Sequence, residues 1–221
     1  MDWSRIIANL DYGKILPAIA RFPVPVAYAL SDLRAWIRFT TCSDTRIAAL
    51  RNIAEAFPEF SPEKVRRTGL EAFRVLSRDE MESYWLERPI EFLQARVEEE
   101  NLEVLDEARK RNRGIFFYTV HMGNPAIFLA LVGRLGYSMN LLLRPLEDFP
   151  MNPRAWLQFG NDRVRRLEKA VGRKILPAGK VAYFTLRRLL RQGETVMMAI
   201  DVVPSLVSRT TIVDFLGLSL I

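Results

Sequence analysis

The second half of the chain alternates between short apolar runs and helical segments, and this alternation restricts the fold more than any other feature. Five runs are typical of buried strands, from GIFFYTV at 114–120 to RTTIVDFLG at 209–217. Between them, helix signals start at Asn124-Pro125 and end at Gly136 and Gly193. Strands separated by helices predict an α/β fold, a sheet flanked by crossover helices. The remaining runs are 138–144, 173–177 and 195–201.

Helix signals dominate the first part of the chain. Ser61 is placed to cap a helix, and Pro62 fits the first helical position. Residues 79–110 are strongly charged and have helical character. We therefore predict two domains, an N-terminal helical lobe at residues 1–110 and an α/β core at residues 111–221.

A helix with an apolar stripe is predicted close to the N-terminus, between residues 26 and 39. Such a stripe lies in a membrane interface or docks on the protein's own core, and the sequence leaves both open. The longest uncharged run here, residues 22–31, is far shorter than the roughly 20 residues that a membrane-spanning helix needs. We therefore expect the lobe to touch a membrane surface without crossing it. The stripe consists of Val26, Leu30, Leu33 and Ile37.

The net charge of +6 is unevenly distributed. Residues 79–107 contain eleven acidic residues against two arginines, whereas residues 161–191 contain ten lysines and arginines against two acidic residues. A basic stripe of this density suits phospholipid head groups, an acidic carrier protein or nucleic acid, and a solvated helix face is an equal alternative. It lacks the interleaved aromatic residues of a nucleic-acid stacking platform, so we expect no nucleic-acid partner and keep a nucleic-acid-binding protein as a second alternative. The candidate binding residues are Arg163, Arg165, Arg166, Lys169, Arg173 and Lys174.

His121, the only histidine, follows an apolar run and opens the string HMGNPA. A neutral imidazole near pH 7 accepts a proton from a hydroxyl, so a histidine between a strand and a helix is a candidate general base. Asn124 is expected to cap the following helix, whose free N–H groups could hold an anion. Asp201 also ends a strand, at the edge where α/β sheets bind ligands. The single cysteine, Cys42, excludes an internal disulfide and a cysteine zinc site, and we expect no metal and no cofactor.

The histidine motif and four further segments resemble one family, in the family's order along the chain. His121, Gly123 and Asn124 are similar to the HxGNWE signature of the bacterial lauroyl/myristoyl lipid A acyltransferases, which belong to the lysophospholipid acyltransferase superfamily with its HxxxxD/E motif. The resemblance covers nearly the whole chain. It implies an acyltransferase-like mixed sheet, and we expect a C-terminal part of that core to be absent after the apolar end FLGLSLI. The further segments are LRNIAEAFPEFSPEK, LLLRPLEDFPMN, RRLLRQGETVMMAIDVVP and TTIVDFLG.

The resemblance implies acyl transfer from a thioester, on acyl carrier protein or coenzyme A, to a lipid or glycolipid acceptor. His121 would take the acceptor's proton, and Gly123 and Asn124 would shape the site. Arg144 matches the family's RP arginine and would contact a head group or a phosphopantetheine phosphate, with a structural ion pair as the alternative. The resemblance also implies a peripheral position on the cytoplasmic face of the inner membrane.

One position departs from the family pattern. The acid that would orient the histidine is Ala126 in this chain, and alanine cannot orient an imidazole. Loss of an orienting carboxylate costs a triad enzyme about 10⁴ in rate. Three alternatives remain: Asp201 supplies the contact, His121 works unassisted, or the chain is a non-catalytic lipid- or carrier-binding homologue.

Overall fold

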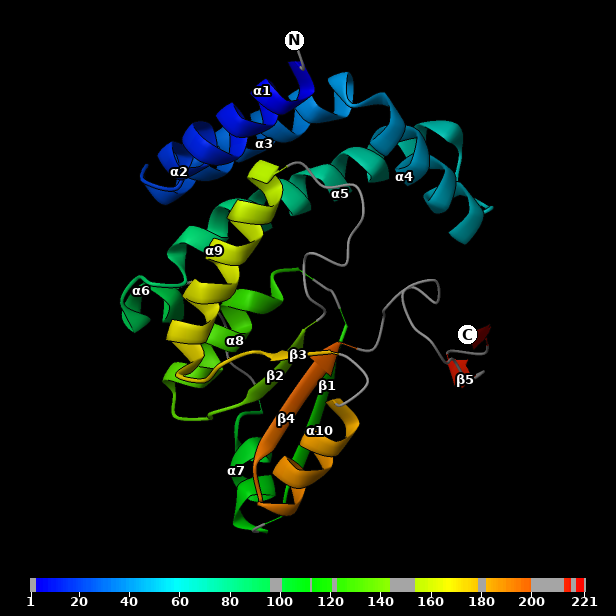
Figure 1. Ribbon diagram of the computed structural model, residues 1–221. Coiled ribbons are helices and arrows are strands. Elements are labelled where there is room, and N and C mark those ends of the chain that lie inside the picture. The colour runs from blue at the N-terminus through cyan, green and yellow to red at the C-terminus, as the bar shows by residue number, and fades with distance from the viewer. Residues whose placement is uncertain are drawn as a thin grey trace. The chain divides into compact units, whose positions relative to one another are not determined.

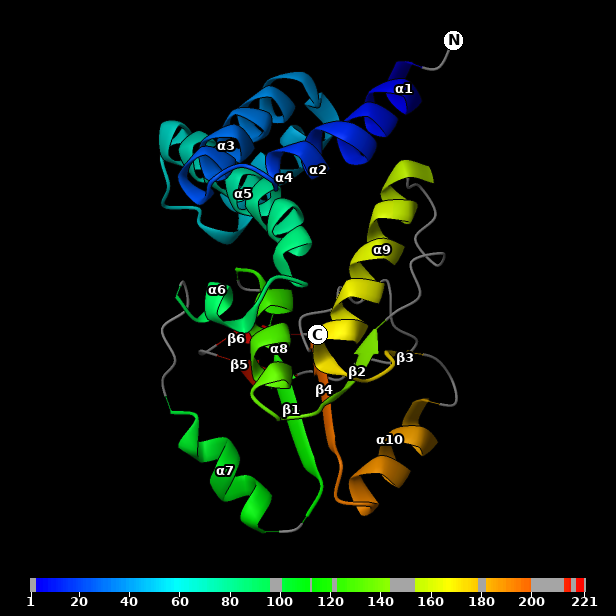
Figure 2. The same ribbon diagram turned by 90° about the vertical axis from the view of Figure 1, so that its left-hand side faces the viewer.

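A computed structural model describes most of the chain (Figure 1, Figure 2). Contacts within the chain divide it into two compact units, and each is described by itself. The helical unit comprises residues 1–100, 123–138 and 144–174, and the sheet unit comprises residues 101–122, 139–143 and 175–221. The described residues are 3–95, 101–111, 113–120, 123–143, 154–178, 182–199, 213–215 and 218–220.

The helical unit combines helices from distant parts of the sequence. Its N-terminal elements are α1 (Trp3–Leu10), the π-helical turn η1 (Asp11–Ile15), α2 (Leu16–Ile19), α3 (Val24–Thr41), α4 (Ser43–Ala56) and α5 (Pro62–Glu82). The later elements are the 3-10 turn η2 (Ser83–Trp85), α6 (Ile90–Gln94), α8 (Pro125–Arg134) and α9 (Arg154–Val171). Ser61 caps α5 as predicted, because its side chain accepts a hydrogen bond from the backbone N–H of Lys64 at 3.3 Å.

Helix α3 confirms the helix predicted at residues 26–39 and separates its two faces. The face that packs against the neighbouring helices contains Ala27, Ser31, Arg34, Ala35 and Phe39. Within the predicted apolar stripe, Leu30 is partly buried against the core. The other three stripe residues are between 43 and 51% exposed, so they do not form the docking face. These three are Val26, Leu33 and Ile37.

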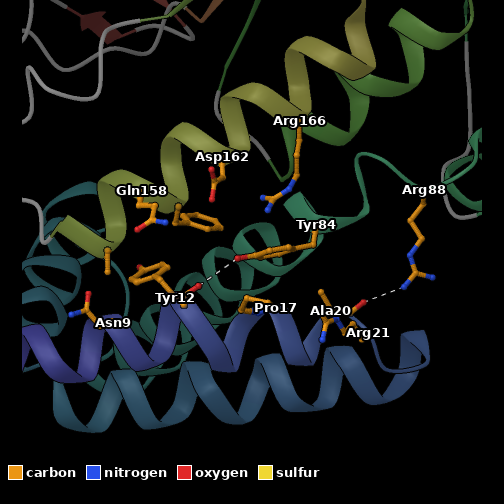
Figure 3. Close-up of a pocket in the computed structure, with 13 residues that line it drawn as sticks. Asn9, Tyr12, Pro17, Ala20, Arg21, Tyr84, Arg88, Gln158, Asp162 and Arg166 are labelled. Carbon is orange, nitrogen blue, oxygen red and sulfur yellow. Dashed lines mark hydrogen bonds between the residues drawn. The ribbon is translucent and has the colours of Figure 1, made fainter.

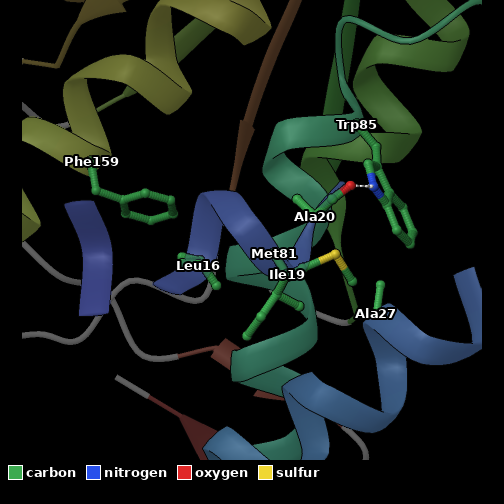
Figure 4. Close-up of a cluster of buried hydrophobic side chains, with 7 residues drawn as sticks. All are labelled: Leu16, Ile19, Ala20, Ala27, Met81, Trp85 and Phe159. Atoms are coloured by element: carbon green, nitrogen blue, oxygen red, sulfur yellow. Dashed lines mark hydrogen bonds between the residues drawn. The ribbon is translucent and has the colours of Figure 1, made fainter. Parts of the chain in front are cut away.

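The core of the helical unit is an apolar cluster around Trp85 (Figure 4). The indole N–H of this buried tryptophan donates a hydrogen bond to the carbonyl of Ala20 at 3.0 Å. Phe159 joins the cluster from α9, so the N-terminal helices share one core with a helix much later in the chain. The remaining members are Leu16, Ile19, Ala27 and Met81.

A buried network of charges joins α3 to η1 and α5. The side chain of Arg34 is only 6% exposed and donates hydrogen bonds to the Asp11 carboxylate at 2.6 and 2.7 Å. It also donates to Oε2 of Glu80 at 2.7 Å, and Arg38 donates to the same oxygen at 2.8 Å. The hydroxyl of Tyr12 donates to the other Glu80 oxygen at 2.9 Å, and burial raises the pKa of this tyrosine. Charges this deeply buried are tolerated only when they are paired.

The sheet unit contains a four-stranded sheet in the order β1-β4-β2-β3. All pairings between these strands are parallel. Two helices, α7 (Glu103–Lys110) and α10 (Ala182–Arg191), belong to the same unit, and α10 contacts β4. The strands are β1 (Ile115–Thr119), β2 (Asn140–Leu143), β3 (Leu176–Pro177) and β4 (Thr195–Ala199), and β5 (Val213–Phe215) forms a separate antiparallel pair with β6 (Leu218–Leu220).

Glycines allow two tight features of the sheet unit. Gly193 has a φ of +79° and ends α10 immediately before β4, a conformation that side chains other than glycine rarely adopt. Gly114 lies against the backbone of Leu190, where a Cβ atom would overlap the carbonyl group. Both glycines therefore permit the short connection between α10 and the paired strands.

The predicted α/β class is confirmed by this parallel sheet and its helices. The mixed character that the family resemblance implied is not present among the four described strands of the sheet. The predicted domain boundary near residue 110 stays a prediction. Within the described ranges, no helix has both the length and the apolar character required to span a membrane.

Candidate functional site

Two candidate positions follow the ends of the paired strands β1 and β4 in the sequence. The two strands pair in parallel, and their last partners in register are Thr119 and Ala199. His121 follows the first of these by two residues, and Asp201 follows the second by two residues. Both lie outside the described residues, as does Arg144, which directly follows β2. Neighbouring strands are about 4.8 Å apart, so the last paired residues, Thr119 and Ala199, lie side by side at the carboxyl edge of the sheet, where α/β sheets bind ligands.

Asn124 begins helix α8 as the sequence predicted. Its Oδ1 atom accepts hydrogen bonds from the backbone N–H groups of Ala126 at 3.0 Å and Ile127 at 3.2 Å. Gly123 precedes it with a φ of +63°, which favours glycine. The cap already uses two N–H groups of the first turn, and Pro125 has none, so the expectation that free N–H groups hold an anion here stays a prediction.

The side-chain amide of Asn124 is held in turn by Glu82, the last residue of α5. Nδ2 of Asn124 donates to Oε2 of Glu82 at 2.8 Å, and the hydroxyl of Tyr28 donates to Oε1 at 2.8 Å. Burial raises the pKa of Glu82, although both hydrogen bonds act in the opposite direction. A chain of contacts therefore runs from α3 through Glu82 to the residue three positions after His121. The sequence gives no signal for Glu82, because it is one of many acidic residues in an acid-rich segment.

Replacing Glu82 with alanine is expected to destabilise the protein by about 1–3 kcal/mol, because the Asn124 amide and the Tyr28 hydroxyl both lose an acceptor. Glu82→Gln should cost less, since its oxygen can face Asn124 while its nitrogen donates to the tyrosine. Urea unfolding followed by tryptophan fluorescence measures both changes.

The pH dependence provides the control for this network. A carboxyl group whose pKa is raised by folding stabilises the native state below its unfolded pKa of about 4.3, and this contribution is lost as pH rises through the folded value. The wild type should therefore gain stability relative to Glu82→Gln as the pH falls from 7 toward 4. Equal stability of the alanine and glutamine variants at every pH would contradict the assigned hydrogen bonds.

Ala126 stands where the family pattern has an acid, and its surroundings are apolar. The residue is 3% exposed and packs in a cluster with Leu86 and Leu93. A carboxylate placed in this cluster would lose its hydration without gaining a partner among the cluster's side chains. The side chains of this cluster are therefore apolar and offer no partner to a carboxylate at this position. The other buried members are Ala130, Leu131 and Ala170.

Arg165 and Arg166 are adjacent in sequence but lie in different environments on α9. Arg165 is 74% exposed and pairs with Asp162 one turn earlier. Arg166 is 18% exposed, and its guanidinium lies 4.2 Å from the ring centroid of Tyr84. Its Nε atom is 3.8 Å from a carboxylate oxygen of Glu87. Arg166 therefore faces the interior of the helical unit and Arg165 faces solvent.

The rest of the predicted basic stripe makes contacts within the chain. Arg163 donates two hydrogen bonds to Asp79, at 2.6 and 2.7 Å. Internal partners of this kind favour a structural role over an open nucleic-acid surface. The further contacts are Lys169 with Glu87 at 2.8 Å, Lys174 with Glu168 at 2.7 Å and Arg173 with Ser138 at 2.7 Å.

The described part of the chain contains no group of three or more histidine, cysteine, aspartate or glutamate side chains that could hold a metal ion. Cys42 is exposed, and its sulfur lies 3.9 Å from the hydroxyl of Thr41. Neither observation assigns a chemical role to this cysteine.

Comparison with known proteins identifies one family. The model of the family described as bacterial lipid A biosynthesis acyltransferase matches residues 12–219. The matched range contains the histidine motif, the β1–β4 edge and the whole of α9. Among curated proteins, no match to the chain was found. The family match confirms the resemblance drawn from the motifs in sequence order.

Proposed function

Because the chain belongs to the bacterial lipid A biosynthesis acyltransferase family, we propose that it moves an acyl chain from a thioester, on acyl carrier protein or coenzyme A, to a hydroxyl of a lipid or glycolipid. The family implies an acyl donor and a lipid acceptor in general terms. The observation that carries the proposal is the register of β1 and β4, which end two residues before His121 and Asp201. Acyl transfer to a lipid acceptor, measured with the wild type and with variants at these two positions, tests it.

The proposed reaction needs a base at the sheet edge. His121 removes the proton from the acceptor hydroxyl while its oxygen attacks the thioester carbonyl carbon. The new C–O bond gives a tetrahedral intermediate, which breaks its C–S bond and releases the thiol. The protonated histidine returns the proton to the leaving sulfur. Asp201 accepts a hydrogen bond from the second ring nitrogen and thereby fixes the tautomer of the base.

Residues close to the histidine and aspartate motifs in the sequence support this assignment. Asn124 and Gly123 begin α8 immediately after the histidine motif, and the Glu82 contact fixes Asn124. Arg144 directly follows β2 in the sequence, and β2 pairs in parallel with β4. We assign this arginine to a phosphate of the donor or the acceptor, since a guanidinium binds phosphate with two donors.

A peripheral position on the cytoplasmic face of the inner membrane is part of the proposal. Helix α3 exposes Leu33, Trp36 and Ile37, and α1 exposes Ile7 and Leu10. Apolar and aromatic side chains of this kind enter the boundary between head groups and acyl chains. The exposed faces of α1 and α3 are therefore the proposed contact with the membrane.

Replacing Leu33 and Ile37 together with glutamate is expected to abolish most of the binding to vesicles that contain anionic lipid. Each glutamate removes an exposed apolar side chain and adds a charge that anionic lipids repel. Co-sedimentation of the protein with the vesicles at low and high salt measures the effect. Val104→Glu on α7, an equally exposed valine, is the matched control and should still sediment. Equal sedimentation of all three proteins would rule out α3 as the contact.

A second candidate function is a non-catalytic homologue that binds lipid or carrier protein. The apolar surroundings of Ala126 favour it, because the family's acid has no place there. In that case the wild type and a His121 variant would show the same background turnover with every acyl thioester, while both still bind the donor or the lipid.

A further inference from the structure

The helical unit contains a cavity that the proposed reaction does not use (Figure 3). Its volume is about 570 Å³, within the range of about 300–1,000 Å³ that is usual for small-molecule sites. Side chains from α1, η1, α2, η2 and α9 line it. All of these elements belong to the helical unit, so the cavity lies within one compact part of the molecule.

One wall of the cavity is aromatic. The ring centroids of Tyr12 and Phe159 are 5.2 Å apart, and those of Tyr84 and Phe159 are 6.1 Å apart. The Tyr84 hydroxyl donates to the backbone carbonyl of Tyr12 at 3.5 Å, which holds the two tyrosines together. The rings of this wall suit the apolar part of an amphiphile.

The charged lining has an excess of arginine. Arg21, Arg88 and Arg166 face one acidic residue, Asp162, whose carboxylate already pairs with Arg165. Arg88 donates to the carbonyl of Ala20 at 3.2 Å, so this arginine and Arg21 lie near one end of the cavity (Figure 3). Three guanidinium groups around one space attract an anion strongly.

Arg166, one of the lining residues, has a donor without an acceptor. Its Nη1 atom is buried and has no hydrogen-bond partner among the described residues. The nearest carboxylate contact of Arg166 is at Nε, 3.8 Å from Glu87, which is beyond hydrogen-bond distance. A buried cationic donor without an acceptor is costly, so a ligand that supplies an acceptor oxygen gains that energy on binding.

We propose that this cavity is a binding site for a terminal phosphate group, one whose negative charge is not offset by choline or another cationic group. The paired N–H donors of a guanidinium match the geometry of phosphate oxygens. The three guanidinium groups carry more positive charge than the single carboxylate of the lining can neutralise. The phosphate belongs to the headgroup of a lipid, whose acyl chains would follow the aromatic wall, or it is a free phosphate ion. The site does not depend on acyl transfer, so a binding measurement tests it separately from the proposed reaction.

Isothermal titration calorimetry on the full chain, with three probes, tests the site. The probes are dihexanoyl phosphatidic acid, dihexanoyl phosphatidylcholine with the same chains, and inorganic phosphate. We expect phosphatidic acid to bind, its affinity to fall with added salt, and phosphatidylcholine to bind at least about tenfold more weakly. If inorganic phosphate binds as tightly as phosphatidic acid, the ligand is free phosphate. If inorganic phosphate binds more weakly than phosphatidic acid, the ligand is the lipid headgroup. Both results support a phosphate site.

Variants locate the binding in the cavity. Arg166→Gln should weaken the binding of phosphatidic acid at least about tenfold, which is the loss of affinity expected for one charge-assisted contact. Gly13→Leu fills the cavity without changing the charge, and its Cβ atom would meet no other atom within 4 Å among those described. Arg67→Gln on α5 removes the same charge from an exposed position outside the lining and should bind like the wild type.

Thermal unfolding of each variant separates lost binding from lost folding, and Gly13→Leu tests the site if Arg166→Gln does not fold. Equal affinity for phosphatidic acid and phosphatidylcholine would overturn the proposal. So would unchanged affinity in the folded Gly13→Leu protein.

Discussion

Replacing His121 with alanine is expected to lower the rate of acyl transfer by about 10²–10⁴, the usual contribution of a general base. The substitution removes the group that accepts the hydroxyl proton, whereas binding of the donor and the acceptor depends on other residues. The effect should therefore appear in kcat more than in KM. Transfer of a radiolabelled acyl chain from acyl carrier protein or coenzyme A to extracted lipid measures the rate.

His121→Gln provides the matched control, because glutamine keeps a hydrogen-bonding side chain but cannot take up a proton at neutral pH. Both variants should lose activity and keep the thermal unfolding midpoint of the wild type. Full activity in His121→Gln would show that the residue positions substrate and does not act as a base.

Replacing Arg34 with methionine is expected to destabilise the protein by about 3–5 kcal/mol, the cost of leaving buried charges without their partner. Asp11 and Glu80 both accept hydrogen bonds from this guanidinium, and Glu80 is nearly inaccessible to solvent. Methionine fills a similar volume, so lost packing contributes little. Urea unfolding monitored by tryptophan fluorescence reports on this region through Trp85, which lies in the same helical unit.

Arg78→Met is the matched control on the same pair of helices. Arg78 binds Asp32 with two hydrogen bonds, at 2.5 and 2.7 Å, but the two side chains are 42% and 27% exposed. A pair this accessible to water contributes about 0–1 kcal/mol. If both substitutions cost the same free energy of unfolding, the burial of Arg34 does not determine its importance.

Local signals predicted the elements of the fold well. Ser61 and Asn124 cap the helices that they were expected to cap, because each cap depends on a few neighbouring residues. The alternation of apolar runs and helical segments after residue 114 predicted the strands of the sheet, because this pattern also depends on neighbouring residues. The end of α5 at Glu82, by contrast, has no local signal as clear as its start, because packing against α3 and α4 stabilises the helix along its length.

Contacts between distant residues could not be predicted from the sequence. Arg34 and Glu80 are 46 positions apart, and no local pattern in the sequence indicates that their side chains form a pair. The basic stripe was visible as composition, but only the structure shows that Arg166 turns inward and Arg165 outward. The network of Glu82 with Asn124 was missed because nothing local distinguishes one glutamate of an acidic segment from the next.

The departure at Ala126 illustrates how the structure changes an inference from sequence. The sequence showed that the family's acid is absent and left open whether Asp201 replaces it, His121 works unassisted or the chain is non-catalytic. The apolar cluster around Ala126 shows that its neighbours leave no polar partner for a carboxylate. His121 and Asp201 each come two residues after the last paired residues of β1 and β4, which makes Asp201 the residue to test.

A double-mutant cycle with His121→Ala and Asp201→Asn tests the central claim most directly, with the rate of acyl transfer to lipid as the measured quantity. If Asp201 acts through the histidine, each single variant loses about 10²–10⁴ in rate and the double variant is no slower than His121→Ala alone. Wild-type activity in Asp201→Asn, or multiplied losses in the double variant, would contradict the assigned pair. Equal turnover by the wild type and His121→Ala would contradict the proposal that the protein is an enzyme.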